Sequence, residues 1–97
     1  MYKMKSRSIY KVPDGKLLKI FLDYDEKYNT INSISITGDF FAYPEESIEI
    51  IEKKLKHAKL NKKFLLNKIN SIIKDCNIEF VGLNAESLTQ GIMMCLS

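Results

Sequence analysis

The side chains of this chain that could carry acid–base chemistry are few and separated. The single histidine, His57, stands among lysines near the end of an expected helix, where it would favour the negative end of the helix dipole. Asp39 follows Gly38 and could act as a general base, or could cap and orient the backbone ahead of a helix. Glu45 and Glu46 are adjacent, so on a helix their side chains diverge and cannot form a carboxylate dyad. The sequence therefore assigns no catalytic residue.

Metal and phosphate chemistry have equally little support. Cys76 and Cys95 lie far apart with no CxxC spacing, and with one histidine they form no zinc pattern. We expect both thiols to be reduced, small core side chains, which is typical of a cytoplasmic protein. Gly15 and Lys16 fall short of a P-loop, which needs a longer glycine-rich loop followed by Ser or Thr. No metal site is predicted.

Aromatic side chains crowd the junction between an expected strand and an expected helix. Phe40, Phe41 and Tyr43 follow Gly38 and precede Pro44. Neighbours on a strand point to opposite faces, so these rings cannot easily all enter the core. Aromatic residues are also enriched at the centres of protein interfaces. The segment therefore serves packing, contact with a partner, or both.

Composition limits the classes of function. Ninety-seven residues make one domain, 1–97, with a core but little volume for an enclosed active site. Fourteen lysines and one arginine are interleaved with twelve acids, and this scattering argues against nucleic-acid binding. No apolar run reaches the length of a membrane span, and the N-terminus lacks the apolar segment of a signal peptide. We expect a cytoplasmic module that works on a partner.

The first half of the chain reads as strands. We expect residues 1–10 to form a partly flexible arm that leads into a short strand over 6–12. Pro13, Asp14 and Gly15 are typical turn residues. Apolar residues at every second position predict a strand from Leu17 to Tyr24, and a returning strand follows over 31–37. Ile31 breaks the alternation of the returning strand, which predicts either a bulge or a later start of that strand.

The second half reads as helices. Pro44 suits the first position of a helix, because its missing N–H costs nothing there. Asn61 is expected to cap a second helix over about 62–75, and Asn84 to cap a third. Residues 77–83 read as a connector whose apolar residues return to the core. Strands followed by helices predict an α+β fold: a small antiparallel sheet of two or three strands with about three helices packed on one face.

Three blocks of sequence then suggest a family. They are Lys11-Val-Pro-Asp-Gly-Lys-Leu-Leu-Lys-Ile, the strand ending Ile34-Ser-Ile-Thr-Gly-Asp-Phe-Phe, and Tyr43-Pro-Glu-Glu-Ser-Ile-Glu-Ile-Ile-Glu-Lys-Lys-Leu. Together they resemble the C-terminal accessory domain of lipoate–protein ligases, a similarity that covers most of residues 11–97. The family's usual Pro-Gly-Gly-Lys turn is Pro-Asp-Gly-Lys here. A chain that starts without a catalytic domain looks like the free-standing small subunit of a bipartite, archaeal-type ligase.

The resemblance implies a subunit that is not catalytic alone. A large catalytic subunit would form a heterodimer with it, bind ATP, Mg²⁺ and lipoate, make lipoyl-AMP, and transfer the lipoyl group to a lysine of a lipoyl carrier protein. The accessory subunit would close the nucleotide site, for which water exclusion and positioning suffice. Lys11 and Lys16 could face the triphosphate, or could be solvated lysines. The expected partner-contacting and site-closing residues are Lys11, Gly15, Lys16, Gly38, Asp39, Phe40, Phe41, Pro44 and Glu45.

Two alternatives stay open at this point. One is a protein-binding or scaffold module related to iron–sulfur scaffolds, although Cys76 and Cys95 both fall at late, helical positions. The other is a small independent enzyme, which would act without any partner.

Overall fold

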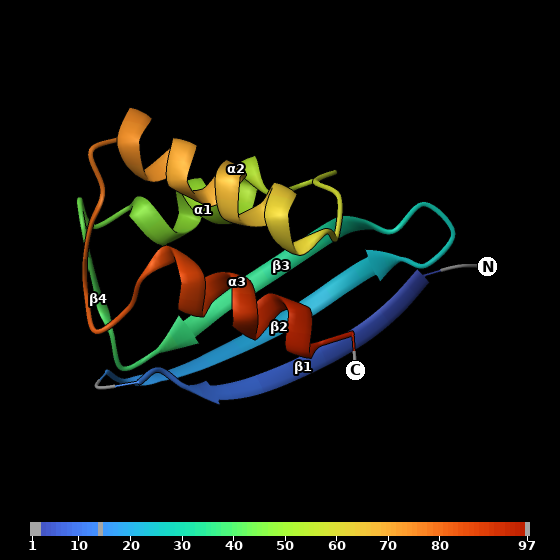
Figure 1. Cartoon of the computed structure of the whole chain (residues 1–97), viewed down its shortest axis with the longest axis horizontal. Coiled ribbons are helices and arrows are strands. Elements are labelled where there is room, and N and C mark those ends of the chain that lie inside the picture. Colours follow the sequence, from blue (N-terminus) through green and yellow to red (C-terminus); the bar gives the residue numbers. More distant parts are fainter. Residues whose placement is uncertain (1–2, 14, 97) are drawn as a thin grey trace.

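The strands and helices follow one another in two groups along the chain. The computed structural model describes residues 3–13 and 15–96. Within them, β1 (Lys3–Lys11), β2 (Leu17–Asp25) and β3 (Thr30–Gly38) form an antiparallel sheet in the order β1-β2-β3. The helices lie on one face of this sheet (Figure 1). The predicted α+β class, with a small antiparallel sheet and helices on one face, is confirmed.

The N-terminal segment belongs to the sheet. β1 begins at Lys3 and pairs with β2 along its whole length, from Lys3 opposite Asp25 to Lys11 opposite Leu17. Residues 1–2 lie outside the described part. The expectation of a partly flexible arm over 1–10 is therefore wrong for residues 3–10, whereas the strand expected over 6–12 is confirmed for residues 6–11. The reason is that β2 offers a full-length partner edge, which a short, polar segment can use even though its own apolar pattern is weak.

The predicted bulge lies in β3. Asp23 of β2 faces Ser33, but the next residue, Tyr24, faces Ile31, so that Asn32 is the extra residue. The bulge returns Ile31 to the helix-covered side, where it is fully buried.

The outer edge of β3 is covered over part of its length. His57 N–H donates to the Ile31 carbonyl at 2.7 Å, and Ile31 N–H donates to the Ala58 carbonyl at 2.9 Å. Thr30 also forms an isolated antiparallel bridge with Lys59. Further along the edge, the Glu52 carboxylate accepts the Ile36 N–H at 2.8 Å. These contacts satisfy backbone groups that an open edge strand would leave to solvent.

A second, two-stranded sheet was not predicted. β4 (Phe41–Tyr43) pairs antiparallel with β5 (Glu79–Val81), which lies within the segment expected to be a connector. The ribbon they form stands at one end of the molecule (Figure 1). Val81 was expected to return to the core but is 56% exposed.

The first helix starts later than expected. α1 spans Ser47–Lys54, so Pro44 is not its first residue. Instead, the backbone N–H and the hydroxyl of Ser47 both donate to the Pro44 carbonyl, at 3.0 Å and 2.6 Å. Because Tyr43 is held in the ribbon, the chain uses residues 44–46 to turn before α1 can begin.

The other two helices begin where their caps predict. α2 (Lys62–Asp75) is capped by the Asn61 side chain, which accepts the Phe64 N–H at 3.0 Å. α3 (Ala85–Met94) is capped by the Asn84 side chain, which accepts the Ser87 N–H at 2.7 Å. Each cap satisfies one of the N–H groups that a helix start leaves unpaired.

One core joins the layers. α1 contacts β3, α3 contacts β1 and β2, and α2 packs against the other two helices. A Cβ on Gly91 of α3 would lie 2.9 Å from Leu18 and 3.3 Å from Ile20, so this glycine lets the helix approach the sheet closely. Among the described residues, no helix is long and apolar enough to cross a membrane. The large, fully buried apolar side chains are Leu18, Ile20, Leu22, Ile31, Ile51, Leu55, Leu65, Ile69, Leu88 and Ile92.

Candidate functional site

The turn between β1 and β2 packs against a second reversal of the chain. Val12 N–H donates to the Lys16 carbonyl at 3.1 Å, and Gly15 N–H donates to the Val12 carbonyl at 2.8 Å, which closes the turn. Lys16 N–H donates in turn to the Gly82 carbonyl at 3.4 Å. This bond joins the turn to the segment between β5 and α3, more than sixty positions further along the chain.

A third reversal of the chain, between β3 and β4, packs against the same two turns. Gly38 has φ +155°, and a Cβ there would lie 2.1 Å from the Leu17 carbonyl oxygen and 3.0 Å from the ring of Phe40. Only glycine fits, because any side chain would collide with backbone. Asp39 N–H donates to the same Leu17 carbonyl at 3.1 Å. We call this group of residues the turn cluster: Gly15, Lys16, Gly38, Asp39, Phe40 and Gly82.

The ribbon leads away from the turn cluster and carries an exposed apolar surface. Phe41 faces Val81 across the ribbon, and Tyr43 faces Glu79. Alternate residues of a strand share a face, so Phe41, Tyr43 and Val81 point to the same side. They are 60%, 57% and 56% exposed. We call these three side chains the ribbon patch.

The two neighbouring phenylalanines have different environments. Phe40 is half-buried and packs against the core, whereas Phe41 is exposed in the ribbon patch. The family resemblance places both among the expected partner-contacting residues. The structure offers Phe41 for that contact.

The remaining predicted site residues are dispersed. Lys11 ends β1 opposite Leu17 and is exposed on the sheet. Pro44 and Glu45 are exposed at the far end of β4, in the turn before α1. The structure thus gathers Gly15, Lys16, Gly38, Asp39 and Phe40 and places Phe41 next to them, but it leaves Lys11, Pro44 and Glu45 outside the turn cluster.

Sequence reasoning left Tyr43 out of the site and missed Val81. Both depend on the pairing of β4 with β5, and the alternation in Glu79-Phe80-Val81 between Asn77 and Gly82 is the signal that could have suggested a strand there.

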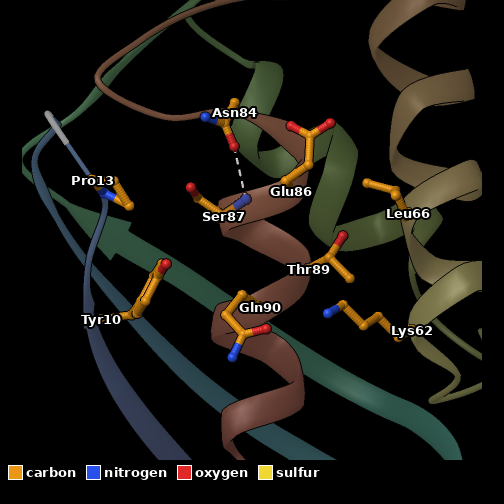
Figure 2. Close-up of a pocket in the computed structure, with 9 residues that line it drawn as sticks. All are labelled: Tyr10, Pro13, Lys62, Leu66, Asn84, Glu86, Ser87, Thr89 and Gln90. Atoms are coloured by element: carbon orange, nitrogen blue, oxygen red, sulfur yellow. Dashed lines mark hydrogen bonds between the residues drawn. The ribbon is translucent and has the colours of Figure 1, made fainter.

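An open groove of about 420 Å³ lies where β1, α2 and α3 meet (Figure 2). Tyr10 lines it from β1, Lys62 from α2 and Gln90 from α3. Two of its other polar side chains serve the helix itself: Asn84 caps α3, and the Thr89 hydroxyl donates to the Ala85 carbonyl at 2.8 Å. The groove is lined by Tyr10, Pro13, Lys62, Leu66, Asn84, Glu86, Ser87, Thr89 and Gln90.

The titratable groups do not converge on a reaction centre. Residues 3–13 and 15–96 contain no group of three or more His, Cys, Asp or Glu side chains placed to hold a metal ion. Burial raises the pKa of the Cys95 thiol, against a smaller opposing effect of a hydrogen bond with Ser8. His57 is exposed and has φ +69°, which suits the residue that ends the α1 region. The geometry offers surfaces for contact and shows no acid–base pair among these residues.

Comparisons with known proteins identify the family of this α+β domain. The family described as the C-terminus of bacterial lipoate protein ligase matches residues 15–92. The chain belongs to this family.

Two individual proteins are similar along most of the chain. "Lipoate-protein ligase A subunit 2" of Thermoplasma acidophilum is 39% identical over 75 residues, which span 77% of this chain and 69% of the relative. A solved structure of an archaeal lipoylation system from the same organism, described as a bi-partite lipoate protein ligase and its E2 lipoyl domain, contains a chain that superposes with a TM-score of 0.79. That match has 27% identity and covers 93% of this chain and 96% of the other.

Proposed function

We propose that this chain is the accessory subunit of a bipartite lipoate–protein ligase and acts with a large catalytic subunit. The observation that carries the proposal is the structural match to a chain of the bi-partite archaeal ligase, which runs almost the full length of both chains. The 39% identity to a protein named as subunit 2 of such a ligase points the same way.

The reaction would be divided between the subunits. The large subunit binds ATP, Mg²⁺ and lipoate; the lipoate carboxylate attacks the α-phosphorus of ATP, pyrophosphate leaves, and lipoyl-AMP forms. A lysine amine of a carrier domain then attacks the lipoyl carbonyl and AMP leaves. The present chain supplies no group that must bond to these reactants. It orders and closes the nucleotide site, where exclusion of water and alignment of the reacting atoms lower the barrier.

The turn cluster and the ribbon patch suit such a role. Three reversals from distant parts of the chain are tied by backbone hydrogen bonds, so the turn cluster is a firm edge from which Lys16 can reach a phosphate. The neighbouring ribbon patch offers Phe41, Tyr43 and Val81 as apolar anchors for the large subunit. Asp39 and Gly38 set the direction in which the chain enters the ribbon.

The role is tested by separating the two half-reactions. The large subunit is assayed for lipoate-dependent pyrophosphate release with and without this chain, and for transfer from preformed lipoyl-AMP to a carrier domain. We expect pyrophosphate release to require the chain and transfer to proceed without it. Equal pyrophosphate release by the large subunit alone would disprove the proposal.

The ribbon patch is tested with a matched pair of aromatic variants. Phe41→Ala removes a ring that is 60% exposed in the patch, and Tyr28→Ala removes one that is 61% exposed in the β2–β3 loop, remote from the ribbon. Central aromatic anchors contribute about 2 kcal/mol or more, so we expect Phe41→Ala to weaken binding of the large subunit roughly 30-fold. Tyr28→Ala should leave the affinity unchanged. The same loss in both variants, or in neither, would contradict the assignment.

The cytoplasm is the proposed location, since ATP-dependent chemistry and two free thiols, Cys76 and Cys95, both fit a reducing compartment. The iron–sulfur scaffold alternative is not favoured. Cys95, the residue that caps the C-terminal end of α3, is buried with its Sγ 3.7 Å from the Gly91 carbonyl oxygen, so its thiol is not available to a cluster at the surface.

A further inference from the structure

Within residues 3–13 and 15–96, no helix covers the second face of the three-stranded sheet (Figure 1). The residues that alternate with the buried ones along each strand point to this side. Among them Ile9 is 59% exposed and Phe21 is 48% exposed, so two large apolar side chains meet solvent there. We call this surface the open face; its residues are Lys3, Lys5, Arg7, Ile9, Lys11, Leu17, Lys19, Phe21, Asp23, Asp25, Ser33, Ser35 and Thr37.

The strand pairing gathers positive charge on the open face. Arg7 lies opposite Phe21, and Lys19 lies opposite Ile9, so each cation has an apolar neighbour on the adjacent strand. Asp23 and Asp25 are the acids of this face and lie opposite Lys5 and Lys3 at the end near the β2–β3 loop; Asp23 accepts a hydrogen bond from the Asn32 side chain at 3.4 Å. Arg7, Lys11 and Lys19 have no acid opposite them on the adjacent strands. Lysines that look scattered in the sequence therefore form a basic surface, because strand alternation places every second residue on one side.

Protection of a sheet edge explains only part of this charge. β1 is an edge strand, and lysines on an edge discourage pairing with another chain. β2 is the central strand, however, and has no free edge to protect. Lys19 and Phe21 on β2 thus need another explanation. A hollow of about 310 Å³ beside Phe21, lined also by Lys5 and Ser35, gives this part of the surface relief that a partner side chain could fill.

We propose that the open face is a docking surface for an acidic protein domain, and, resting on the proposed function, that this domain is the lipoyl acceptor of the ligase. Charge complementarity with the basic side chains brings the acceptor to the complex, and Phe21 and Ile9 supply apolar contact once it has arrived. The open face carries one arginine and one exposed aromatic ring, Phe21. This suits a carboxylate-rich protein surface better than a nucleic acid, which calls for bidentate phosphate contacts and repeated base stacking.

The test uses the complex of the large subunit with this chain and the apo lipoyl domain of the cognate E2 protein. The double variant R7E/K19E reverses two charges on the open face, and K56E/K63E makes the same change in net charge on exposed residues outside it. We expect R7E/K19E to raise the KM for the lipoyl domain about tenfold, equivalent to ~1.4 kcal/mol. Pyrophosphate release without the lipoyl domain should be unchanged, and K56E/K63E should behave as wild type.

A milder variant and the salt dependence keep the test independent of folding. R7Q/K19Q should raise the same KM about threefold, and the wild-type KM should rise with ionic strength more steeply than that of R7E/K19E, because screening weakens only attractions that are present. An unchanged KM in both open-face variants overturns the proposal.

Three further results have defined meanings. Loss of large-subunit binding in R7E/K19E would make the open face part of that interface and overturn the proposal. Loss of binding to a labelled single-stranded oligonucleotide with an unchanged KM would assign the face to nucleic acid and also overturn it. Failure of the wild-type chain to stimulate pyrophosphate release would refute the accessory role, while the KM comparison would still decide the docking surface.

Discussion

Replacing Glu52 should loosen the junction between α1 and the edge of β3. The Glu52 carboxylate accepts the Ile36 N–H at 2.8 Å, and this bond connects a helix to a strand sixteen positions away. A hydrogen bond to a charged group contributes about 1.5–3 kcal/mol, and because this one is only part-buried, water can replace some of it in the variant. We therefore expect Glu52→Ala to lower the free energy of unfolding by about 1.5 kcal/mol.

Thermal and urea unfolding measure that loss. For a domain of this size 1 kcal/mol corresponds to about 4–8 °C, so the melting temperature should fall by roughly 6–12 °C. Glu52→Gln keeps an acceptor oxygen without the charge and should lose about half as much. Glu49→Ala, an exposed residue one turn earlier on the same helix, is the control and should change stability by no more than about 0.5 kcal/mol.

Hydrogen exchange gives a local readout. The Ile36 amide should exchange faster in Glu52→Ala, whereas amides in the centre of α2 should change only as much as global stability does. Equal unfolding free energies for Glu52→Ala and Glu49→Ala, or an unchanged Ile36 exchange rate, would refute the reasoning.

Three other changes test separate parts of the fold. Gly38→Ala places a Cβ 2.1 Å from the Leu17 carbonyl oxygen. Because this combines strain at positive φ with the loss of a backbone hydrogen bond, we expect the free energy of unfolding in urea to fall by about 3 kcal/mol. A decrease below about 1 kcal/mol would contradict the geometry. Asn84→Ala removes the α3 cap and should cost about 1 kcal/mol, with Asn84→Asp close to wild type in the same assay. Burial raises the pKa of the Cys95 thiol, so the folded protein holds this proton more tightly than the unfolded chain. The contribution of the thiol to the free energy of unfolding should therefore be complete below pH 9 and decline above it. Cys95→Ala should remove this decline. Alkylation in the native protein should therefore label half-buried Cys76 before Cys95.

The elements with local signals could be predicted from sequence. The alternation from Leu17 to Tyr24 and the side-chain caps at Asn61 and Asn84 depend on residues a few positions apart, and the structure has a strand and two helices there. The bulge opposite Tyr24 was also predictable. When the alternation of apolar residues is interrupted in a paired strand, one extra residue in that strand restores the buried side.

Features that depend on distant pairing were not predictable in the same way. β4 and β5 are three residues each, too short for a periodic signal, and each exists because the other lies beside it. Their pairing holds Tyr43 in a strand and so delays α1 to Ser47. It also decides which phenylalanine is exposed. The sequence thus marked the segment from Gly38 to Glu45 as a candidate site, but its outward side chains could not be separated from its inward ones.

The charge pattern shows a related limit. Counting along the chain, the basic residues are interleaved with acids. In the sheet, alternation and register place Arg7 and Lys19 on one surface with Phe21. A basic face could have been derived by listing only every second residue of the strands expected over 6–12 and 17–24, which already contain Arg7 and Lys19.

α3 is the last element of the chain but packs on the first two strands, and this has a consequence for synthesis of the protein. The Ser8 hydroxyl donates to the Gly91 carbonyl at 2.6 Å across 83 positions, and Gly91 seats α3 against Leu18 and Ile20. At about 5–20 residues per second, the first hairpin waits roughly 4–14 s after its own translation before α3 is made. During that interval the apolar side of the hairpin has no cover from the helix that will bury it. A ribosome paused ahead of α3 should therefore hold a nascent chain that chaperones bind, although every strand of the large sheet has already been synthesised.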